Sequence, residues 1–339
     1  MKDLFNEEYL VHSSSYRETM NSIVLPWLDK IEHACMIPGY HDRPLYSVSY
    51  DAEEPVGTVL IVHGFTENAL KYAELIWSLL HLHFSVVVYD QRGHGRSWRS
   101  DGIPDPSVTH VDSFTEYVED LHIICDTLQN HIREPLFVFG HSMGGAVVSL
   151  FLEQYPCIFH AAVLSSPMIA PNLRGVPVPL ASMMAGFARL LGKEKKNPFF
   201  MSLYAGPEDF STSCATDQER FAWYDEIKAD HREFQNSVPS YRWSAEAMRV
   251  TKRILSPGNP EKISCPVLLF TSDQDRSVLP GPQQDFISRI PQGRHVFVKD
   301  SRHEIYRSEN KVLYPWWHQV ISFYLETADS LSRRGGTPS

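Results

Sequence analysis

Basic charge and long hydrophobic runs are scarce in this sequence, and each scarcity excludes a class of protein. The 339 residues carry 31 Lys and Arg against 41 Asp and Glu, a formal net charge of −10. Because phosphate binding needs a basic surface, this balance argues against nucleic acid as a partner. It also disfavours simple electrostatic docking onto anionic lipid. No segment approaches the roughly 18–20 unbroken apolar residues of a membrane-spanning helix.

Cysteine is also scarce, and the five cysteines are scattered without a Cys-x-x-Cys pair. We interpret them as reduced, mostly buried thiols, with no zinc site. The stretch 90–97 lacks the Gly-Lys-Ser/Thr ending of a phosphate loop, and no Gly-x-Gly-x-x-Gly opens the chain. The acidic first eight residues lack the apolar region of a signal peptide. We therefore expect no metal, no cofactor and a cytoplasmic protein, either free or peripheral to the inner face of the membrane.

The chain does contain a series of short, continuous apolar runs. Such runs suit strands that are covered on both faces, as in a parallel sheet. A β-hairpin over 34–50 precedes them, and helical stretches separate them, the clearest beginning with the capping box Ser113-x-x-Glu116. This alternation predicts an α/β fold with a doubly wound, mostly parallel sheet. The runs cover residues 58–64, 84–90, 136–139, 161–164, 266–270 and 295–298.

The alternation breaks in an insertion that is rich in proline, methionine and aromatic residues. We predict a helical cap over 168–255, inserted between a first core part, 1–167, and a second core part, 256–328. The polar, glycine-containing tail 329–339 is predicted to be disordered.

An apolar stripe at helical spacing runs through the first part of this cap, from Leu180 to Leu191. Such a stripe most often packs on the core of its own protein. Its position favours a cap over an active site, with Met183, Met184 and Phe187 as an adaptable apolar wall for a substrate. The same stripe motivates the hypothesis that the cap touches a membrane surface.

A glycine-flanked serine lies at Gly140-His141-Ser142-Met143-Gly144, between an apolar run and a helical pattern. It matches Gly-x-Ser-x-Gly, the strand–turn–helix in which a nucleophilic serine is exposed above a sheet. A Cβ at either glycine would crowd the sharp turn between the two backbones. Alone, the motif could be a glycine-rich turn with a structural serine. The partners further along the chain decide against that interpretation.

A serine nucleophile needs a base and an orienting acid, and in elbow hydrolases the order along the chain is Ser, Asp or Glu, His. His303 follows the last apolar run on a short loop, which suits a general base that must reach Ser142. Asp273 and Asp275 both follow the fifth run, at the carboxyl end of a strand. Asp275 is preferred because apolar packing resumes at Val278, and Asp273 would then be a solvated carboxylate or a turn former.

Ester or amide hydrolysis also needs backbone N–H groups that stabilise the tetrahedral oxyanion. One donor should be Met143, which directly follows the nucleophile. The other should be Phe65, because His63-Gly64 before it allows close approach of the backbone. His141 points away from the elbow and is interpreted as structural.

Motifs in several parts of the chain form one recognisable set. They are His63-Gly64, Asp90-Gln91-Arg92-Gly93-His94-Gly95-Arg96-Ser97, His110-Val111-Asp112-Ser113-Phe114, Gly140-His141-Ser142-Met143-Gly144-Gly145, Ser240-Tyr241-Arg242-Trp243 and His303-Glu304-Ile305. With them, residues 30–325 resemble the α/β-hydrolase branch that contains monoacylglycerol lipases and bacterial lysophospholipases, the bacterial inner-membrane lysophospholipases most closely. The resemblance implies an α/β-hydrolase fold and a serine esterase or lipase for monoacyl lipids, with Ser142, Asp275 and His303 as its triad.

The leading hypothesis is therefore carboxylic-ester hydrolysis through an acyl-Ser142 intermediate, with a small ester or monoacyl lipid as substrate. A prolyl-type aminopeptidase is the alternative within the superfamily, and it would need acidic cap residues to hold a substrate amine. A non-catalytic ligand-binding module is the alternative outside enzymes. The acidic residues available in the cap are Glu208, Asp209, Asp217 and Glu219.

Overall fold

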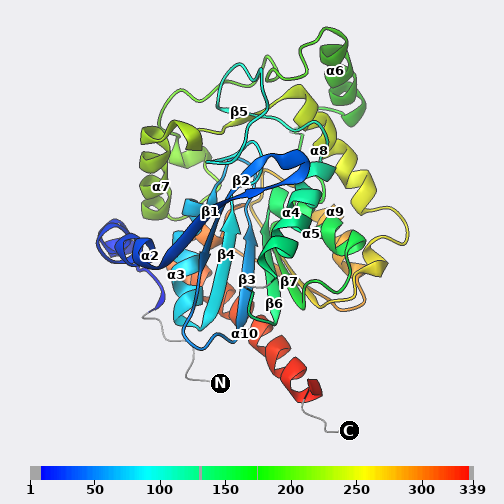
Figure 1. Cartoon of the computed structure of the whole chain (residues 1–339). Coiled ribbons are helices and arrows are strands. Elements are labelled where there is room, and N and C mark those ends of the chain that lie inside the picture. The colour runs from blue at the N-terminus through cyan, green and yellow to red at the C-terminus, as the bar shows by residue number, and fades with distance from the viewer. Residues whose placement is uncertain (1–8, 130–131, 174, 336–339) are drawn as a thin grey trace.

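A mixed, mostly parallel sheet forms the centre of the fold (Figure 1). The computed structural model describes residues 9–129, 132–173 and 175–335. In these ranges the main sheet has eight strands in the order β1-β2-β4-β3-β6-β7-β9-β10, with β1–β2 and β2–β4 antiparallel and the other pairs parallel. The predicted doubly wound sheet is confirmed, and the hairpin and all six apolar runs are its strands. They are β1 (Glu32–Pro38), β2 (Pro44–Tyr50), β3 (Gly57–Val62), β4 (Phe84–Tyr89), β6 (Leu136–His141), β7 (Ala161–Ser165), β9 (Val267–Ser272) and β10 (Gly293–Val298).

Helices connect the parallel strands, and a further group lies between β7 and β9. A second, two-stranded sheet pairs β5 (Val108–Thr109) with β8 (Val238–Pro239), and so joins the first core part to the inserted segment. The helices are α1 (Tyr16–Thr19), α2 (Leu25–Ile31), α3 (Ala73–His81), α4 (Thr115–Leu128), α5 (Met143–Gln154), α6 (Val178–Leu190), α7 (Gln218–Asp230), α8 (Tyr241–Ile254), α9 (Pro280–Ser288) and α10 (Asn310–Gly335).

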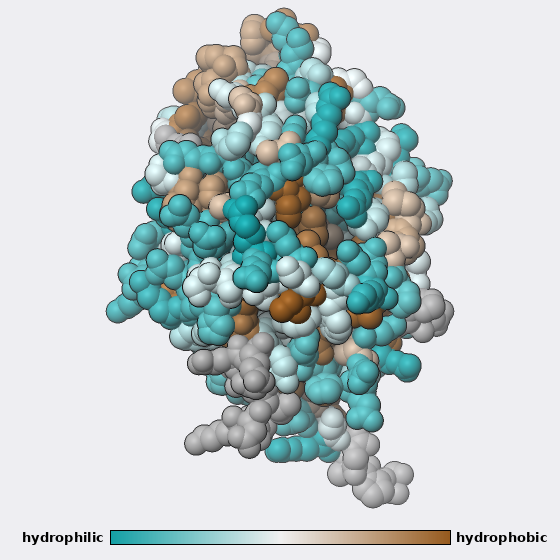
Figure 2. All heavy atoms as spheres, turned by 90° about the vertical axis from the view of Figure 1, so that its left-hand side faces the viewer, coloured by the Kyte–Doolittle hydropathy of each residue, from teal (hydrophilic) through white to brown (hydrophobic). Residues whose placement is uncertain are grey.

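The predicted cap, 168–255, contains α6, α7 and α8, and its described residues (168–173 and 175–255) contribute no strand to the main sheet. Two of these helices are packed into the core: Trp223 and Tyr224 of α7 join one core cluster, and Trp243 and Val250 of α8 join the other. The remaining helix, α6, packs on α8 and stands at the tip of the molecule (Figure 1). Apolar atoms gather on the surface at that end (Figure 2). The boundaries of the cap remain a prediction.

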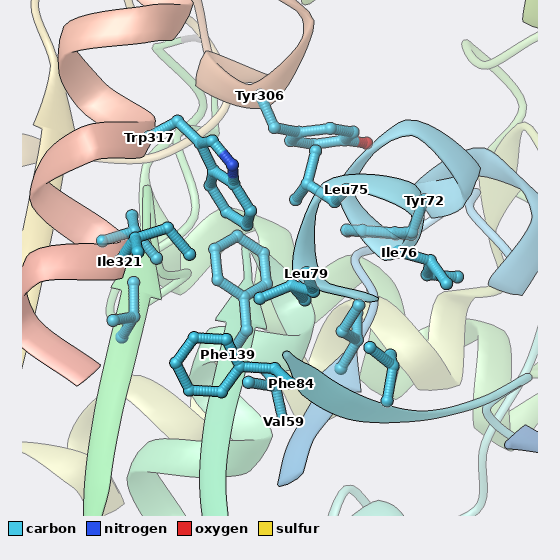
Figure 3. Packing of buried hydrophobic residues seen from close by; sticks show 14 of the residues in the cluster. Val59, Tyr72, Leu75, Ile76, Leu79, Phe84, Phe139, Tyr306, Trp317 and Ile321 are labelled. Atoms are coloured by element: carbon cyan, nitrogen blue, oxygen red, sulfur yellow. The ribbon is translucent and has the colours of Figure 1, made fainter. Parts of the chain in front are cut away.

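Alternate residues of the central strands enter two separate hydrophobic clusters, one on each face of the sheet. On β3, Val59 and Ile61 belong to the cluster that includes α3 and α10, whereas Leu60 and Val62 belong to the one that includes α4, α5 and α9. Figure 3 shows part of the first cluster, in which Val59 lies beside Phe84 of the neighbouring strand β4. Because successive side chains point to opposite faces, a strand buried on both faces must be apolar throughout, as the sequence of β3 is.

The chain reverses its direction across the sheet between β3 and β6. From β3, the connection through α3 leads to β4 on one side, and from β6 the connection through α5 leads to β7 on the other. The two strands are neighbours, with Val62 opposite Gly140. Ligands of open α/β sheets bind at such a switch point, beyond the carboxyl ends of the strands. The loops that follow β3 and β6 therefore form the natural site.

Three local expectations need correction. The helix predicted to begin with a capping box starts at Thr115 without a side-chain cap, because Glu116 is used in an ion pair with Arg92 at 2.6 Å. The tail predicted as disordered is helical through Gly335, since α10 is already nucleated and each further residue adds a backbone hydrogen bond; residues 336–339 lie outside the described residues. Of the five free cysteines, only Cys125 and Cys265 are buried.

None of the helices in the described ranges is both long enough and apolar enough to cross a membrane.

Candidate active site

Ser142 occupies a sharp turn between β6 and α5. Its backbone has φ 50° and ψ −116°, a region that costs a non-glycine residue about 1–3 kcal/mol. The turn is tight enough that a Cβ at Gly144 would lie 2.0 Å from the carbonyl oxygen of Val62, so this position requires glycine. The Ser142 N–H donates to the carbonyl of Ser165 at 3.1 Å, which fixes the turn against β7. The predicted strand–turn–helix around the serine is present.

The side chains of Ser142, His303 and Asp275 form one chain of hydrogen bonds. The distance from Nε2 of His303 to Oγ of Ser142 is 2.8 Å, and that from Nδ1 to Oδ2 of Asp275 is 2.7 Å. Ser142 follows β6, Asp275 follows β9, and His303 lies in the loop after β10, so all three stand at the carboxyl edge of the sheet. Along the chain, His303 is 161 residues from Ser142 and 28 residues from Asp275. Only the sheet topology brings the three side chains together.

Asp275 is oriented by the turn in which it lies. Its Oδ1 accepts the backbone N–H groups of Ser277 at 2.8 Å and Val278 at 3.0 Å. Its Oδ2 accepts the hydroxyl of Ser272 at 3.0 Å in addition to the His303 ring. One oxygen is thus held by the backbone, and the other is aimed at His303.

Asp273, the alternative aspartate, has a different set of partners. Its two oxygens accept the backbone N–H groups of Asp300 at 3.0 Å and Ser301 at 3.1 Å. It therefore ties the end of β9 to the loop that leads to His303. The structure brings Asp275 to the imidazole and leaves Asp273 as a support of the loop.

Burial and charge act in opposite directions on the two titratable partners. Burial raises the pKa of Asp275, but His303 and the backbone donors outweigh it, and the net pKa is lowered. Burial lowers the pKa of His303, but Asp275 outweighs it, and the net pKa is raised above its ordinary value. The carboxylate therefore stays ionised, and the imidazole is a stronger base than it would be alone.

The two predicted oxyanion donors lie at the ends of neighbouring strands. Met143 is the first residue of α5, and the first N–H groups of a helix have no acceptor within it. Phe65 follows Gly64 in the loop after β3, and its ring lies 4.3 Å from that of Trp243 on α8. The cap helix therefore packs directly against the loop that carries the predicted donor.

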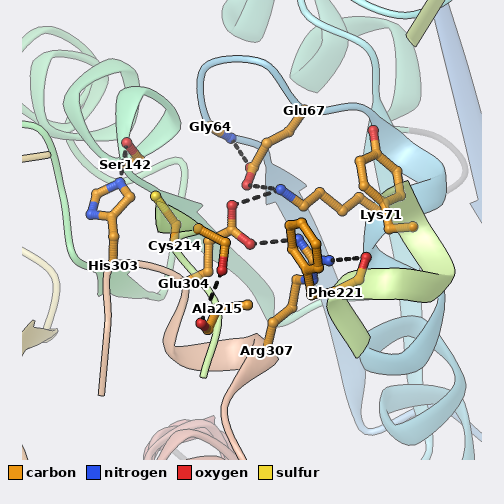
Figure 4. A network of polar contacts seen from close by, with 12 residues as sticks. Gly64, Glu67, Lys71, Ser142, Cys214, Ala215, Phe221, His303, Glu304 and Arg307 are labelled. Atoms are coloured by element: carbon orange, nitrogen blue, oxygen red, sulfur yellow. Dashed lines mark hydrogen bonds and ion pairs between the residues drawn. The ribbon is translucent and has the colours of Figure 1, made fainter. Parts of the chain in front are cut away.

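A buried polar cluster lies beside this loop (Figure 4). Glu67 accepts the backbone N–H of Gly64 at 2.5 Å and the hydroxyls of Tyr72 and Tyr306 at 2.6 Å each. Its carboxylate thereby fixes the residue immediately before Phe65.

The same cluster extends to the neighbour of His303. Lys71 donates to Glu67 at 3.1 Å and to Glu304 at 2.7 Å, and Arg307 donates to Glu304 at 2.6 Å. Burial raises the pKa of the Glu67 carboxyl, but Lys71, His141 and the two tyrosine hydroxyls outweigh it, and the net pKa lies well below its ordinary value. Burial also raises the pKa of Glu304, but Lys71 and Arg307 outweigh it, and the pKa falls to about 2. The loop after β3 and the loop that carries His303 are thus joined through paired charges.

Sequence reasoning missed this cluster, although Glu67 follows His63-Gly64 by three residues and Glu304 follows His303 directly. It did anticipate His141, whose Nδ1 lies 3.0 Å from the carbonyl oxygen of Ser165 and whose Nε2 lies 3.6 Å from Glu67. His141 is therefore a partner of the buried cluster.

The predicted apolar wall of the cap is not brought to the serine. Met183 and Phe187 lie on α6 at the tip of the molecule, with 64% and 62% of their surface exposed, and Met184 beside them is half-buried. Within the described ranges, no group of three or more His, Cys, Asp or Glu side chains is arranged to hold a metal ion.

This sheet, with a serine on the turn after its central strand and a histidine and an aspartate at the same edge, defines a serine hydrolase of the α/β-hydrolase class. Solved structures agree with the fold. A carboxyl esterase from Bacillus coagulans superposes with a TM-score of 0.70 at 16% identity, over 88% of this chain and 99% of that one. A monoacylglycerol lipase from Paleococcus ferrophilus superposes with a TM-score of 0.64 at 22% identity, over 84% of this chain and 99% of that one.

The chain belongs to the serine aminopeptidase family S33, whose model matches residues 53–310. Lysophospholipase L2 of Escherichia coli K12 is 28% identical over 301 residues, which are 84% of this chain and 85% of that protein. A monoacylglycerol lipase of Mycolicibacterium smegmatis is 32% identical over 152 residues, 44% of this chain and 50% of that protein. The resemblance inferred from the motifs is confirmed.

Proposed function

We propose that this protein hydrolyses carboxylic esters of monoacyl lipids, as a lysophospholipase or a monoacylglycerol-lipase-like esterase. The observation that carries the proposal is the continuous hydrogen-bonded chain from Ser142 through His303 to Asp275. It supports a nucleophile, a general base and an orienting acid in these three roles.

In the proposed reaction, Nε2 of His303 takes the proton of Ser142 while Oγ attacks the ester carbonyl carbon. The N–H groups of Phe65 and Met143 stabilise the oxyanion of the tetrahedral intermediate. His303 then gives its proton to the leaving alcohol, and an acyl-Ser142 ester remains. In the second half, His303 takes a proton from water, the hydroxide attacks the acyl carbon, and the proton returns to Ser142 as the acid leaves.

The monoacyl lipid class is supported by the relatives whose names state their substrates, a lysophospholipase that matches along 84% of the chain and monoacylglycerol lipases. An amine-binding aminopeptidase is supported less well, because three of the four acidic residues available for it are engaged. Asp217 pairs with Arg220, Glu208 with Lys228, and Asp209 accepts from Ser211.

Hydrolysis of p-nitrophenyl esters over a series of acyl lengths tests the proposal, followed by lysophospholipid and monoacylglycerol. We expect a rate that rises toward medium or long chains and falls on the order of 10⁶-fold in Ser142→Ala. Ser149→Ala is the matched control, since this hydroxyl, on the same helix, bonds only the carbonyl of Gly145. Activity confined to acetate, or to aminoacyl-arylamides, would discard the lipid substrate. Inertness toward every substrate and toward a serine-directed phosphonate would favour a binding module.

A further inference from the structure

Oδ2 of Asp275 accepts two hydrogen bonds, and the proposed reaction uses only one of them. Nδ1 of His303 lies 2.7 Å from this oxygen, and the hydroxyl of Ser272 lies 3.0 Å from it. Ser272 is the last residue of β9, and only 2% of its surface is exposed. Because an ionised carboxylate has no proton to give, the hydroxyl is the donor in this bond. Ser272 and the general base therefore share a single oxygen of the triad acid.

The donors around Asp275 hold both of its oxygens. Oδ1 accepts the backbone N–H groups of Ser277 at 2.8 Å and Val278 at 3.0 Å, which belong to the turn after β9. Oδ2 is held from the strand by Ser272 and from the loop after β10 by His303. Rotation of the carboxylate would therefore break hydrogen bonds on both oxygens at once. The Ser272 hydroxyl gives the oxygen that contacts the base a fixed point on the sheet.

We propose that Ser272 is a positioning residue of the triad, whose hydroxyl holds Oδ2 of Asp275 opposite Nδ1 of His303 and takes up part of its negative charge. This role rests on the proposed hydrolysis through Ser142, and it holds whichever ester is cleaved. A donor to the charged form of a carboxylate makes that carboxylate a weaker base. Ser272 therefore limits how strongly Asp275 retains the imidazolium proton, which His303 must give to the leaving alcohol within the same reaction.

Further titratable groups surround His303, and their charges are fixed near neutral pH. The ring of His141 on β6 lies 4.9 Å from that of His303, and Glu304 and Glu67 act on His303 as negative charges. Burial lowers the pKa of His141 to about 4, while paired cations hold the pKa of both glutamates below its ordinary value. Cys214 of the inserted segment feels the charge of the triad acid, and burial raises the pKa of its thiol to about 12. A pKa that moves near neutral pH in a Ser272 variant is therefore that of His303.

The pH–rate profile of Ser272→Ala, measured with a medium-chain p-nitrophenyl ester, tests the proposal. We expect kcat to fall about tenfold, because a hydrogen bond to a charged group is lost. The acidic limb should move to higher pH by about half a unit to one unit, since Oδ2 then retains the imidazolium proton more strongly. Loss of the carboxylate itself would move the limb in the opposite direction, and a merely structural role of Ser272 would leave the limb in place.

Two further variants serve as rescue and control. Ser272→Thr keeps a hydroxyl on a β-branched side chain that suits a strand, and it should restore the position of the limb. Ser149→Ala removes a hydroxyl that is equally buried but bonds the uncharged carbonyl of Gly145, and its limb should not move. Melting temperatures report that each variant is folded. A limb that stays in place or moves to lower pH in Ser272→Ala, that moves equally in Ser149→Ala, or that is not restored in Ser272→Thr would overturn the proposal.

NMR titration of His303 makes the same test without catalysis. The protein carries isotope-labelled histidine, and the signal of His303 is assigned by its loss in His303→Gln. We expect a higher pKa of His303 in Ser272→Ala than in the wild type. If the wild type hydrolyses no ester, the proposed function fails, and this titration still decides whether Ser272 acts on the histidine. If the wild type hydrolyses esters and the pKa of His303 is equal in the two proteins, only the role of Ser272 is refuted.

Discussion

Replacing Asp275 by asparagine separates the roles of the two aspartates beyond β9. Oδ1 of Asp275 accepts two backbone N–H groups, from Ser277 and Val278, which an amide NH₂ group cannot do. In Asp275→Asn the amide oxygen must therefore keep this place, and the amide nitrogen takes the place of Oδ2, 2.7 Å from Nδ1 of His303.

This substitution reverses the histidine tautomer. Opposite an NH₂ donor, Nδ1 of His303 has to accept, so the proton moves to Nε2, which then points at Ser142 and cannot take its proton. We expect kcat to fall about 10⁴-fold, which is about 5 kcal/mol in activation free energy. The carboxylate that raises the pKa of His303 is also lost, so the acidic limb of the pH–rate profile should move to lower pH.

Steady-state hydrolysis of a medium-chain p-nitrophenyl ester as a function of pH measures both effects. Asp273→Asn is the matched control, because it lies two residues away and contacts only the N–H groups of Asp300 and Ser301. It should cost about 1–3 kcal/mol of stability and leave kcat within about tenfold of the wild type, with the acidic limb unmoved. Equal losses in the two variants, or a large loss only in Asp273→Asn, would refute the assignment of Asp275.

Two predictions concern the scaffold around the site. Gly144→Ala places a Cβ 2.0 Å from the Val62 carbonyl oxygen and should cost at least about 3 kcal/mol in urea unfolding, whereas Gly186→Ala, with open space around it on α6, should stabilise by about 0.5–1 kcal/mol. A Gly144→Ala protein as stable as the wild type would contradict the packing argument. Burial raises the pKa of Glu304, but Lys71 and Arg307 outweigh it and lower the pKa to about 2. Because that folded-state pKa is depressed, Glu304 contributes stability above about pH 4.5, and this contribution is lost as the pH falls toward 2. Glu304→Gln should be less stable at pH 7 and should flatten the pH dependence in that window, as measured by unfolding at a series of pH values; an unchanged slope would contradict this coupling.

Local sequence patterns predicted much of the fold because the central strands are buried on both faces. A strand such as β3 must be apolar at every position, which leaves a short continuous run that can be recognised in isolation. The strand–turn–helix around Ser142 could also be recognised from the sequence, because its sharp turn requires glycine at positions on either side of the serine. The order of residues along the chain then predicted His303 as the general base, because the triad partners follow the order of the strands that carry them.

Other features had no local signal. The pairing of β5 with β8 joins residues about 130 positions apart, and each strand is only two residues long. The extension of α10 through a polar segment depends on the helix that precedes it, and composition alone favoured disorder. Glu116 stood where a capping box would place it, but an arginine from another loop competed for its carboxylate.

The sequence by itself determined the class of fold and the strand–turn–helix that contains Ser142, because both depend on the periodicity and spacing of near neighbours. Only the tertiary structure shows that Asp275 contacts His303 while Asp273 contacts the backbone of Asp300 and Ser301, since the two aspartates lie at the same place in the chain and differ in which distant atoms they reach. It also decided that Glu67 and Glu304 share Lys71, 233 residues from Glu304 along the chain. A buried charge is costly unless it is paired, and its partner can come from any part of the chain that folding brings close. Local sequence patterns do not show which distant residues will meet.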